Sequence, residues 1–347
     1  MPGVAQFEGR TTKSEGADVL MEQRTIGKLA VSVVGLGCNQ LGTQYCDEAT
    51  SARIVSEALD AGVTYFDTAD EYGENYFDST DPDGWGRCEE YLGRALGARR
   101  GEVIIGSKFG ARPHYDQTLG GGSAKWARQA LEDSLRRLGT DYIDLYQLHF
   151  PDPDVPIEET LGVMNEFVAA GKVREIGCSN LTGAALEEAA TAAADNDLLP
   201  FASIEGPLNL LQRGNLDEVL PTADRLGMAY IPYYPLASGV LTGKYRRGEA
   251  FPEASRMADK VPDGMGAKIL SDRAFNRIEA LEAFATERGH TLIELAFGWL
   301  LGQPAVASVI AGASKPGQVT VNVGAAGWQL SPQEVALATQ VVVDAGN

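Results

Sequence analysis

The sequence predicts an α/β fold, a (β/α)8 barrel of the TIM type with an N-terminal hairpin, a long loop after the seventh strand and an extra C-terminal helix. Eight short apolar runs rich in β-branched residues predict the strands, and they lie near residues 35, 65, 104, 145, 175, 203, 230 and 308. Helical patterns separate nearly all of these runs, and several of the helices end at a glycine directly before the next run. This alternation favours a parallel sheet covered by helices.

The elements follow in order from the N-terminus. Residues 1–20 are expected to form a flexible tail, and residues 21–347 a single barrel domain that begins with a short hairpin at 21–32. After the first strand, the helix at 51–62 has its apolar positions on one stripe, and the strand at 63–67 follows directly. The same unit recurs, with helices that end at Gly97, Gly139, Gly171 and Gly227.

The remaining elements complete the barrel. The segment 201–206 predicts the sixth strand, and a helix at 291–302 precedes the eighth strand. The connection at 236–271 is long and rich in Gly, Pro, Lys and Arg, and we expect a functional lid or clamp there. Ser331 as N-cap and Pro332 in the first helical position predict the C-terminal helix.

An open, doubly wound sheet is the main alternative fold. It requires glycines in the pattern G-x-G-x-x-G after the first strand. Gly35, Gly37 and Gly42 have the spacing G-x-G-x-x-x-x-G, which does not fit. The length of 347 residues alone suggests two domains, but the eight repeated units favour one barrel.

Composition narrows the function. The chain has 29 Lys plus Arg against 48 Asp plus Glu, a net charge of −19, which argues against a nucleic-acid partner. With 44% hydrophobic and 22% charged residues, it is expected to bury a large core. No segment has the pattern of a signal peptide or a membrane span, so we expect a cytoplasmic protein without a membrane partner. The four cysteines lack C-x-x-C spacing and the chain has three histidines, so no metal site is expected.

Three ionisable residues stand at matching strand ends. Asp67, Lys108 and His149 follow the second, third and fourth predicted strands and are separated by 41 residues each. Because the carboxyl ends of barrel strands share one rim, we expect these side chains to converge there. Tyr72, five residues after Asp67 in a turn-forming stretch, is expected to fold back over the same mouth.

Each of these residues alone has an ordinary explanation, such as a helix N-cap for the aspartate. Together they indicate acid–base chemistry. A buried ammonium beside a tyrosine favours the phenolate and makes the tyrosine a stronger acid, while Asp67 keeps Lys108 charged. Tyr72 is then a general acid for a developing alkoxide, and a neutral His149 hydrogen-bonds the substrate oxygen. A cofactor is expected to supply the hydride.

Six segments, in order, resemble the block motifs of the aldo-keto reductase superfamily, in particular its longer-loop bacterial-type members. They are GVTYFDTADEYG, IIGSKFG, DLYQLHFPDPDVPIEETL, GKVREIGCSN, YYPLASGVLTGKY and VIAGASKPGQV, within about residues 21–345. The resemblance implies a barrel that binds NADP(H) or NAD(H) without a Rossmann fold. It also implies an NADP-dependent carbonyl reductase or alcohol dehydrogenase activity, with Asp67, Tyr72, Lys108 and His149 as its catalytic tetrad.

The same resemblance implies a set of cofactor-binding residues. Ser179 and Asn180 would hold the nicotinamide carboxamide, Tyr233 would stack on its ring, and Glu205 stands in the sixth strand where many members bind the carboxamide with glutamine. The pyrophosphate would be lined by Leu236, Ser238, Gly239, Leu241 and Lys244, and the adenosine end by Ser314, Lys315, Gln318 and Asn322. Hydroxyls, loop amides and the dipole of the last barrel helix suit phosphate oxygens.

Two positions depart from the family pattern. Glu205 donates a hydrogen bond only when it is protonated, unlike the usual glutamine. Gln318 stands where NADP-specific members often carry an arginine for the 2′-phosphate, and glutamine cannot pair that group in the same way. NADP(H) is favoured and NAD(H) is the alternative, and the residues left to hold the 2′-phosphate are Ser314, Lys315, Lys244, Arg246 and Arg247.

The loops suggest where the substrate binds. The insertion at 75–86 is either a wall of the substrate pocket or a surface loop. Trp126 and Phe150 are further pocket candidates, and Phe109 is equally consistent with a place in the core.

The expected function is reversible reduction of a small aldehyde or ketone. Two alternatives stay open, a cofactor-binding regulatory subunit similar to potassium-channel β subunits, and a sugar or alcohol dehydrogenase or an isomerase that uses the same site. The physiological substrate, the direction in vivo and the oligomeric state are not predicted.

Overall fold

The computed structural model describes residues 21–73, 84–112, 116, 118–252, 255 and 270–346. The predicted tail, most of the insertion at 75–86 and part of the long seventh loop lie outside the described residues. The strands and helices that position the rim of the barrel lie within them.

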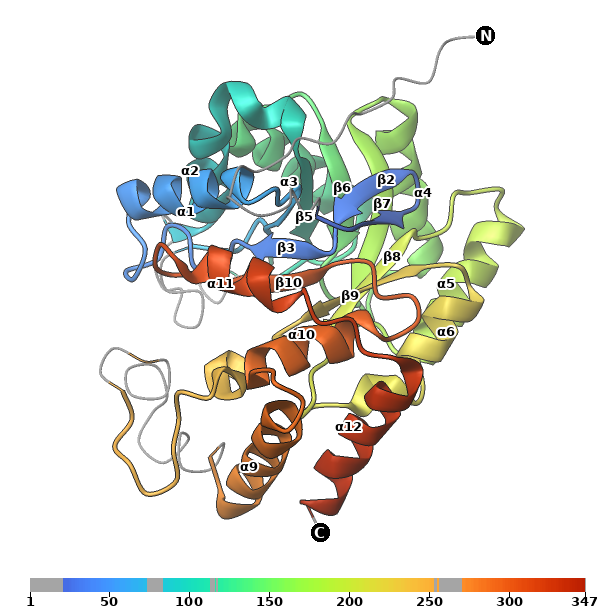
Figure 1. The fold of residues 1–347 in the computed structure, drawn as a ribbon. Coiled ribbons are helices and arrows are strands. Elements are labelled where there is room, and N and C mark those ends of the chain that lie inside the picture. The colour runs from blue at the N-terminus through green and yellow to red at the C-terminus, as the bar shows by residue number, and fades with distance from the viewer. Residues whose placement is uncertain are drawn as a thin grey trace, which may run out of the picture.

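A central barrel of eight parallel strands is present, as the sequence predicts (Figure 1). The strands lie in the order β10-β3-β4-β5-β6-β7-β8-β9, so each strand from β3 to β9 pairs with its neighbours in sequence. They are β3 (Val34–Gly37), β4 (Tyr65–Asp67), β5 (Ile104–Phe109), β6 (Ile143–Leu148), β7 (Val173–Ser179), β8 (Ser203–Pro207), β9 (Ala229–Tyr233) and β10 (Val309–Gly312). Every apolar run identified in the sequence falls on one of these strands.

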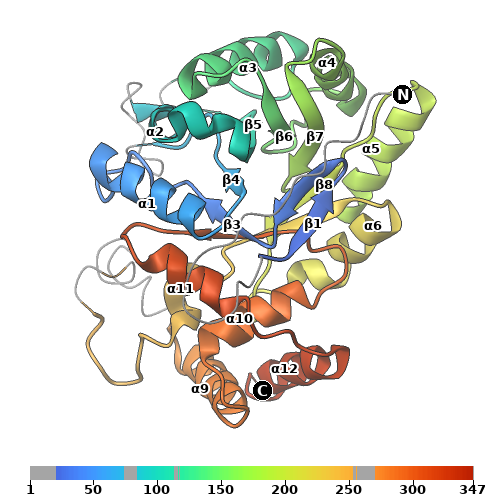
Figure 2. The ribbon, with the colours of Figure 1, turned by 45° about the horizontal axis from the view of Figure 1, so that its top comes forward.

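Helices surround the strands, as Figure 2 shows. Their bounds are α1 (Glu48–Asp60), α2 (Arg87–Leu96), α3 (Ala124–Leu138), α4 (Ile157–Ala169), α5 (Gly183–Asp195), α6 (Val219–Arg225), α9 (Asp272–Thr286), α10 (Leu292–Leu301), α11 (Gln318–Ala325) and α12 (Pro332–Asp344). The main hydrophobic core lies between the outward faces of the strands and the inward faces of these helices. Burial of that apolar surface is the principal force that holds the barrel together.

Local sequence signals set several helix ends. Gly139 closes α3 with a φ of 64°, a left-handed conformation that glycine adopts without the steric cost of a Cβ atom. At α12, the Ser331 side chain accepts from the amide of Glu334, the Glu334 side chain accepts in return from Ser331, and Pro332 occupies the first turn. The predicted C-terminal helix and its cap are therefore confirmed.

The predicted N-terminal hairpin closes one end of the barrel. It consists of β1 (Gln23–Ile26) and β2 (Leu29–Ser32), which pair antiparallel. Ile26, Leu29 and Val31 pack in one buried cluster with inward-facing barrel residues. Because the hairpin contacts the amino ends of the strands, for example through Lys28 N to Glu175 Oε1 at 3.0 Å, the open end of the barrel is the carboxyl end.

The barrel closes between β9 and β10 by a short seam. A single bridge joins Tyr230 to Val306. Two backbone hydrogen bonds accompany it, Tyr230 N to Ala305 O at 2.7 Å and Ala307 N to Tyr230 O at 3.0 Å. Every other neighbouring pair of barrel strands shares at least two residue pairs in register.

Candidate active site

The three residues predicted from strand ends lie together at the open end of the barrel. Asp67 is the last residue of β4, Lys108 lies near the end of β5, and His149 directly follows β6. The Nζ atom of Lys108 is 2.6 Å from Asp67 Oδ2 and also donates to the carbonyl of Thr68 at 2.9 Å. The Lys108 side chain is 0% exposed and that of Asp67 3%, so the ion pair is held away from solvent.

A turn after β4 brings Tyr72 back over this pair. The chain continues to pair with β5 through the amides of Thr68 and Asp70, and then turns with Tyr72 N bonded to Ala69 O at 3.3 Å. The Lys108 Nζ atom lies 5.1 Å from the centre of the Tyr72 ring, and the His149 ring meets that ring edge-on at 5.7 Å. The structure therefore brings all four predicted catalytic residues into one cluster.

Burial and charge set the protonation states in this cluster. Burial alone would lower the pKa of Lys108, but the carboxylates of Asp67 and Glu205 raise it well above its usual value. Burial and the Lys108 charge lower the pKa of His149 well below its usual value. These effects favour a charged lysine and a neutral histidine at neutral pH.

Glu71 is a neighbour of the site that sequence reasoning missed. Its Oε1 atom lies 3.1 Å from His149 Nδ1, with 11% of the Glu71 side chain exposed. Its position directly before Tyr72 in the chain is the sequence feature that could have identified Glu71 as a neighbour of the site. A carboxyl group this close to Nδ1 adds a negatively charged neighbour to the imidazole.

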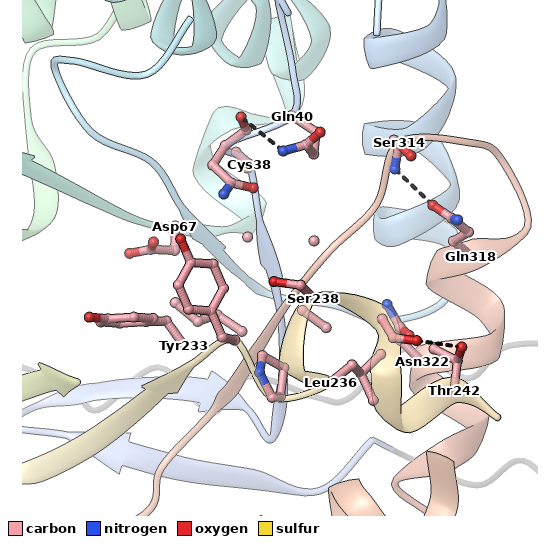
Figure 3. Close-up of a pocket in the computed structure, with 18 of the residues that line it drawn as sticks. Cys38, Gln40, Asp67, Tyr233, Leu236, Ser238, Thr242, Ser314, Gln318 and Asn322 are labelled. Atoms are coloured by element: carbon pink, nitrogen blue, oxygen red, sulfur yellow. Dashed lines mark hydrogen bonds between the residues drawn. The ribbon is translucent and has the colours of Figure 1, made fainter. Parts of the chain in front are cut away.

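A continuous pocket of about 870 Å³ runs from this cluster to the loop before α11. Figure 3 shows Asp67 and Tyr233 at one end, Leu236 and Ser238 in the middle, and Ser314, Gln318 and Asn322 at the other end. The predicted residues that line it are Asp67, Tyr72, His149, Asn180, Glu205, Tyr233, Leu236, Ser238, Gly239, Lys244, Ser314, Lys315, Gln318 and Asn322. Phe150 also lines it.

Other predicted residues lie behind the pocket wall. Lys108 is fully buried beneath it, and Leu241 belongs to the hydrophobic core. Ser179 is buried, and its hydroxyl donates to the carbonyl of Glu205 at 3.2 Å. Trp126 packs against the core and is absent from the described lining, and Phe109 is a core residue stacked on Tyr146.

Strained backbone is concentrated around the pocket. Among the described residues, six other than glycine have positive φ, and Asn180 (61°), Tyr234 (55°) and Ser238 (58°) line the pocket. The Asn180 side chain is fixed on both sides, because its amide donates to His149 O at 3.0 Å and its carbonyl accepts from the Tyr233 hydroxyl at 2.8 Å. Backbone strain held by tertiary contacts is typical of functional sites.

Side chains of the protein accept hydrogen bonds from several amides of the loop before α11, the loop whose amides and helix dipole were expected to face phosphate oxygens. Gln318 Oε1 accepts from the amides of Ser314 and Lys315 at 2.8 and 3.1 Å, the first of which Figure 3 shows. Glu57 of α1 accepts from the amides of Gly317 and Thr320 at 2.7 and 2.9 Å. A carboxylate therefore caps the helix where an anionic ligand was expected.

The cations available to the pocket are also fewer than expected. Arg246 pairs with Glu282, with Nη2 to Oε1 at 2.9 Å, and Arg247 pairs with Glu279, with Nε to Oε1 at 2.9 Å. Neither arginine is part of the described lining. Within that lining, Lys244 and Lys315 carry the positive charge.

Two further searches cover only the part of the chain that the structure describes. No cluster of three or more His, Cys, Asp or Glu side chains there has the arrangement of a metal site. None of the helices there combines the length and the apolar character needed to cross a bilayer.

Comparison with known proteins identifies the family. The model of the aldo/keto reductase family matches residues 33–342. Aldo-keto reductase YhdN of Bacillus subtilis strain 168 is 34% identical over 322 residues, which cover 90% of this chain and 91% of that protein. A rice protein named a probable voltage-gated potassium channel subunit beta is 32% identical over 313 residues, covering 88% and 91%. The structure of a glycerol dehydrogenase from Gluconobacter oxydans superimposes with a TM-score of 0.75 at 28% identity, covering 92% of this chain and 94% of that one. The chain therefore belongs to the aldo/keto reductase family, whose members are oxidoreductases that use nicotinamide cofactors.

Proposed function

We propose that this protein reduces the carbonyl group of small aldehydes or ketones to an alcohol, reversibly, with Tyr72 as the general acid. The observation that carries the proposal is the buried Lys108–Asp67 ion pair beneath the Tyr72 ring, beside a neutral His149 at the end of a long pocket. The fixed ammonium favours the phenolate that remains after Tyr72 gives up its proton. In this proposal, His149 hydrogen-bonds the substrate oxygen.

The volume and the polar lining of the pocket support a nicotinamide dinucleotide as its ligand. Its 870 Å³ lies at the upper end of the range for small-molecule sites. Asn180, Glu205 and Tyr233 would hold the nicotinamide end, and Ser179 would fix Asn180 from behind. The phosphates and the adenosine would be held by the remaining lining residues, which are Leu236, Ser238, Gly239, Lys244, Ser314, Lys315, Gln318 and Asn322. Leu241 would support this lining from the core. When bound, the cofactor supplies the hydride that the carbonyl carbon accepts.

The test is a paired assay of NADPH and NADH oxidation with short aldehydes, aromatic aldehydes, sugars and ketosteroids. Cofactor oxidation that depends on a carbonyl substrate supports the proposal. No turnover with any of these carbonyls and either cofactor would contradict it.

Cofactor preference has a specific prediction at Lys315. With Arg246 and Arg247 paired elsewhere, we propose that Lys315 makes the main contact to the 2′-phosphate, and that NADP(H) is favoured over NAD(H) for this reason. Lys315→Met should weaken NADPH binding about tenfold, the usual scale for a lost charge-assisted hydrogen bond, and leave NADH binding unchanged. Titration of the cofactor by fluorescence measures both affinities, and Arg246→Met is the matched control that should change neither. Equal effects of Lys315→Met on the two cofactors would assign the 2′-phosphate to another group.

Exposed aromatic side chains at the rim indicate how the substrate is held. Tyr45, Phe150 and Tyr234 are among the few large hydrophobic residues that the described surface exposes, and all three line the pocket. The Phe150 ring stacks on the His149 ring at 4.4 Å with an interplanar angle of 16°, so its outer face extends the platform beside the proposed acid.

Phe150→Ala is therefore expected to raise KM for aromatic aldehydes by roughly three- to tenfold, the scale of one stacking contact. Steady-state kinetics with benzaldehyde and a short aliphatic aldehyde measure the difference. Because the aliphatic substrate cannot stack, its KM should rise less. An equal rise for both would indicate that Phe150 acts through His149 alone.

A second candidate function comes from the relatives. The rice relative is named a probable potassium channel subunit, so we also consider a regulatory subunit that binds the cofactor. Negligible turnover across the carbonyl panel, together with co-purification with a membrane channel, would favour this function over the first.

A further inference from the structure

Glu205 adds a second carboxyl group to the catalytic lysine. Its Oε2 atom lies 3.3 Å from Lys108 Nζ, which is also 2.6 Å from Asp67 Oδ2, and the Glu205 side chain is 3% exposed. Lys108 is the one cation that forms an ion pair with either carboxyl group among the described residues. Two buried carboxyl groups therefore face a single positive charge.

We propose that Asp67 and Glu205 together hold one proton beside the Lys108 ammonium, and that this proton resides on Glu205. Its presence sets how strongly Lys108 favours the phenolate of Tyr72. The effect on Tyr72 rests on the proposed function. The existence and location of the proton concern the protein without substrate and do not depend on that function.

Charge balance requires such a proton. With both carboxyl groups ionised, the site would carry a net negative charge in a place from which water is excluded. Like charges that share a desolvated site cannot both ionise readily, and one of them keeps its proton. Among the described residues, no second cation pairs with Glu205, whose polar neighbours besides Lys108 include Gln147 of β6, Tyr65 and Asp67 of β4, and Tyr230 and Tyr233 of β9.

Geometry places the proton on Glu205. Asp67 is closer to the ammonium and also accepts from the Tyr65 hydroxyl at 3.3 Å, so its anion is the better stabilised. Beyond the ammonium, Glu205 has the Gln147 amide at 3.4 Å. Burial, followed by the Asp67 charge, raises the pKa of Glu205 to about 8, which agrees with this assignment.

The location of Glu205 lets the proton exchange. Glu205 lines the pocket, whereas Lys108 lies beneath its wall. When the pH rises, the Glu205 proton leaves to water in the pocket, and a new negative charge arises 3.3 Å from Lys108 Nζ. That charge offsets the ammonium, whose Nζ is 5.1 Å from the Tyr72 ring centre, and makes Tyr72 a weaker acid.

The test compares thermal stability with pH in the wild type and in Glu205→Gln. A folded-state pKa of about 8 lies above the unfolded value of about 4.3, so the fold holds a proton that the unfolded chain releases between these values. Wild-type stability therefore contains a contribution that falls as pH rises from about 4.5 to 8. Glutamine lacks this contribution, so the Tm of Glu205→Gln minus that of the wild type should rise by several degrees across the window.

Glu57→Gln is the control of opposite sign. Although burial opposes it, the hydrogen bonds to α11 lower the pKa of Glu57, so its carboxylate stabilises the fold above its unfolded pKa. The Tm of Glu57→Gln minus that of the wild type should therefore fall as pH rises through about 4. A Glu205→Gln difference that falls in the same way would show that Glu205 is an ordinary ionised partner of Lys108 and would overturn the proposal.

If Glu205→Gln does not fold, infrared spectra of the wild type with ¹³C-labelled glutamate decide the question. The proposal requires a protonated glutamic acid band at neutral pH that disappears as pH rises through about 8. Absence of that band overturns the proposal.

Kinetics then test the link to Tyr72. Carbonyl reduction by the wild type should fall to a lower rate with a midpoint near pH 8, and this step should be absent in Glu205→Gln. If the pH–rate profile is the same in both proteins, the effect of Glu205 on Tyr72 is refuted, and the shared proton is supported by the stability result alone. Absence of any carbonyl reduction, with the stability result intact, refutes the proposed function alone.

Discussion

Tyr72→Phe is expected to abolish carbonyl reduction, with kcat lowered at least about a thousandfold, while cofactor affinity stays within about twofold of the wild type. The substitution removes the proposed proton donor, and general acids contribute about 10²–10⁴ to such rates. It keeps the ring that Lys108 and His149 contact, so the pocket retains its shape. Single-turnover kinetics measure the rate, and fluorescence titration measures the affinity.

Tyr45→Phe is the matched control for this change. Tyr45 lines the same pocket but is 41% exposed at its rim, so loss of its hydroxyl should leave kcat within a few-fold of the wild type. If Tyr72→Phe retained the wild-type kcat, the assignment of Tyr72 as the acid would be refuted, and another donor at the rim would have to be sought.

Lys108→Met is expected to inactivate the protein and to lower its free energy of unfolding by about 3–5 kcal/mol near pH 8, the cost of leaving a buried charge without its partner. Asp67 and Glu205 would then face each other without a cation. The fold would relieve the repulsion by binding protons on both groups, so the loss should become smaller as pH falls toward about 5. Denaturant unfolding at the two pH values measures both effects.

The surface pair of Lys172 and Glu132 provides the control. Both side chains are well exposed, at 41% and 58%, and Lys172→Met should cost less than about 1 kcal/mol at either pH. A Lys108→Met protein as stable as this control would show that the two buried carboxyl groups are neutral without the lysine.

The predictable part of this protein is the part governed by periodicity. Short apolar runs and glycine-ended helices identified all eight barrel strands, because each unit repeats the same burial pattern. The cluster of Asp67, Lys108 and His149 followed from their equal spacing, since the carboxyl ends of parallel strands meet at one rim. The ring of Tyr72 lies where its turn was expected to place it.

Contacts between distant segments could not be predicted. Glu57 caps α11 from α1, across about 260 residues of chain, and no local pattern announces that pairing. The same holds for Arg246 and Arg247, whose charges are taken up by α9 rather than offered to the pocket. Glu205 was noted as a departure from the family pattern, but its proximity to Lys108 follows from how β5 and β8 face each other across the barrel interior.

The seam between β9 and β10 has a mechanical consequence. On one side of it Tyr233 and Tyr234 line the pocket, and on the other side Gly312 and Ser314 do so. A molecule that binds along the pocket therefore touches both edges of the joint that has the fewest strand pairings in the barrel. Because such a ligand contacts both sides of the β9–β10 seam, its binding opposes separation of these two strands. In this barrel, the free energy of ligand binding therefore also stabilises the closed form of the seam.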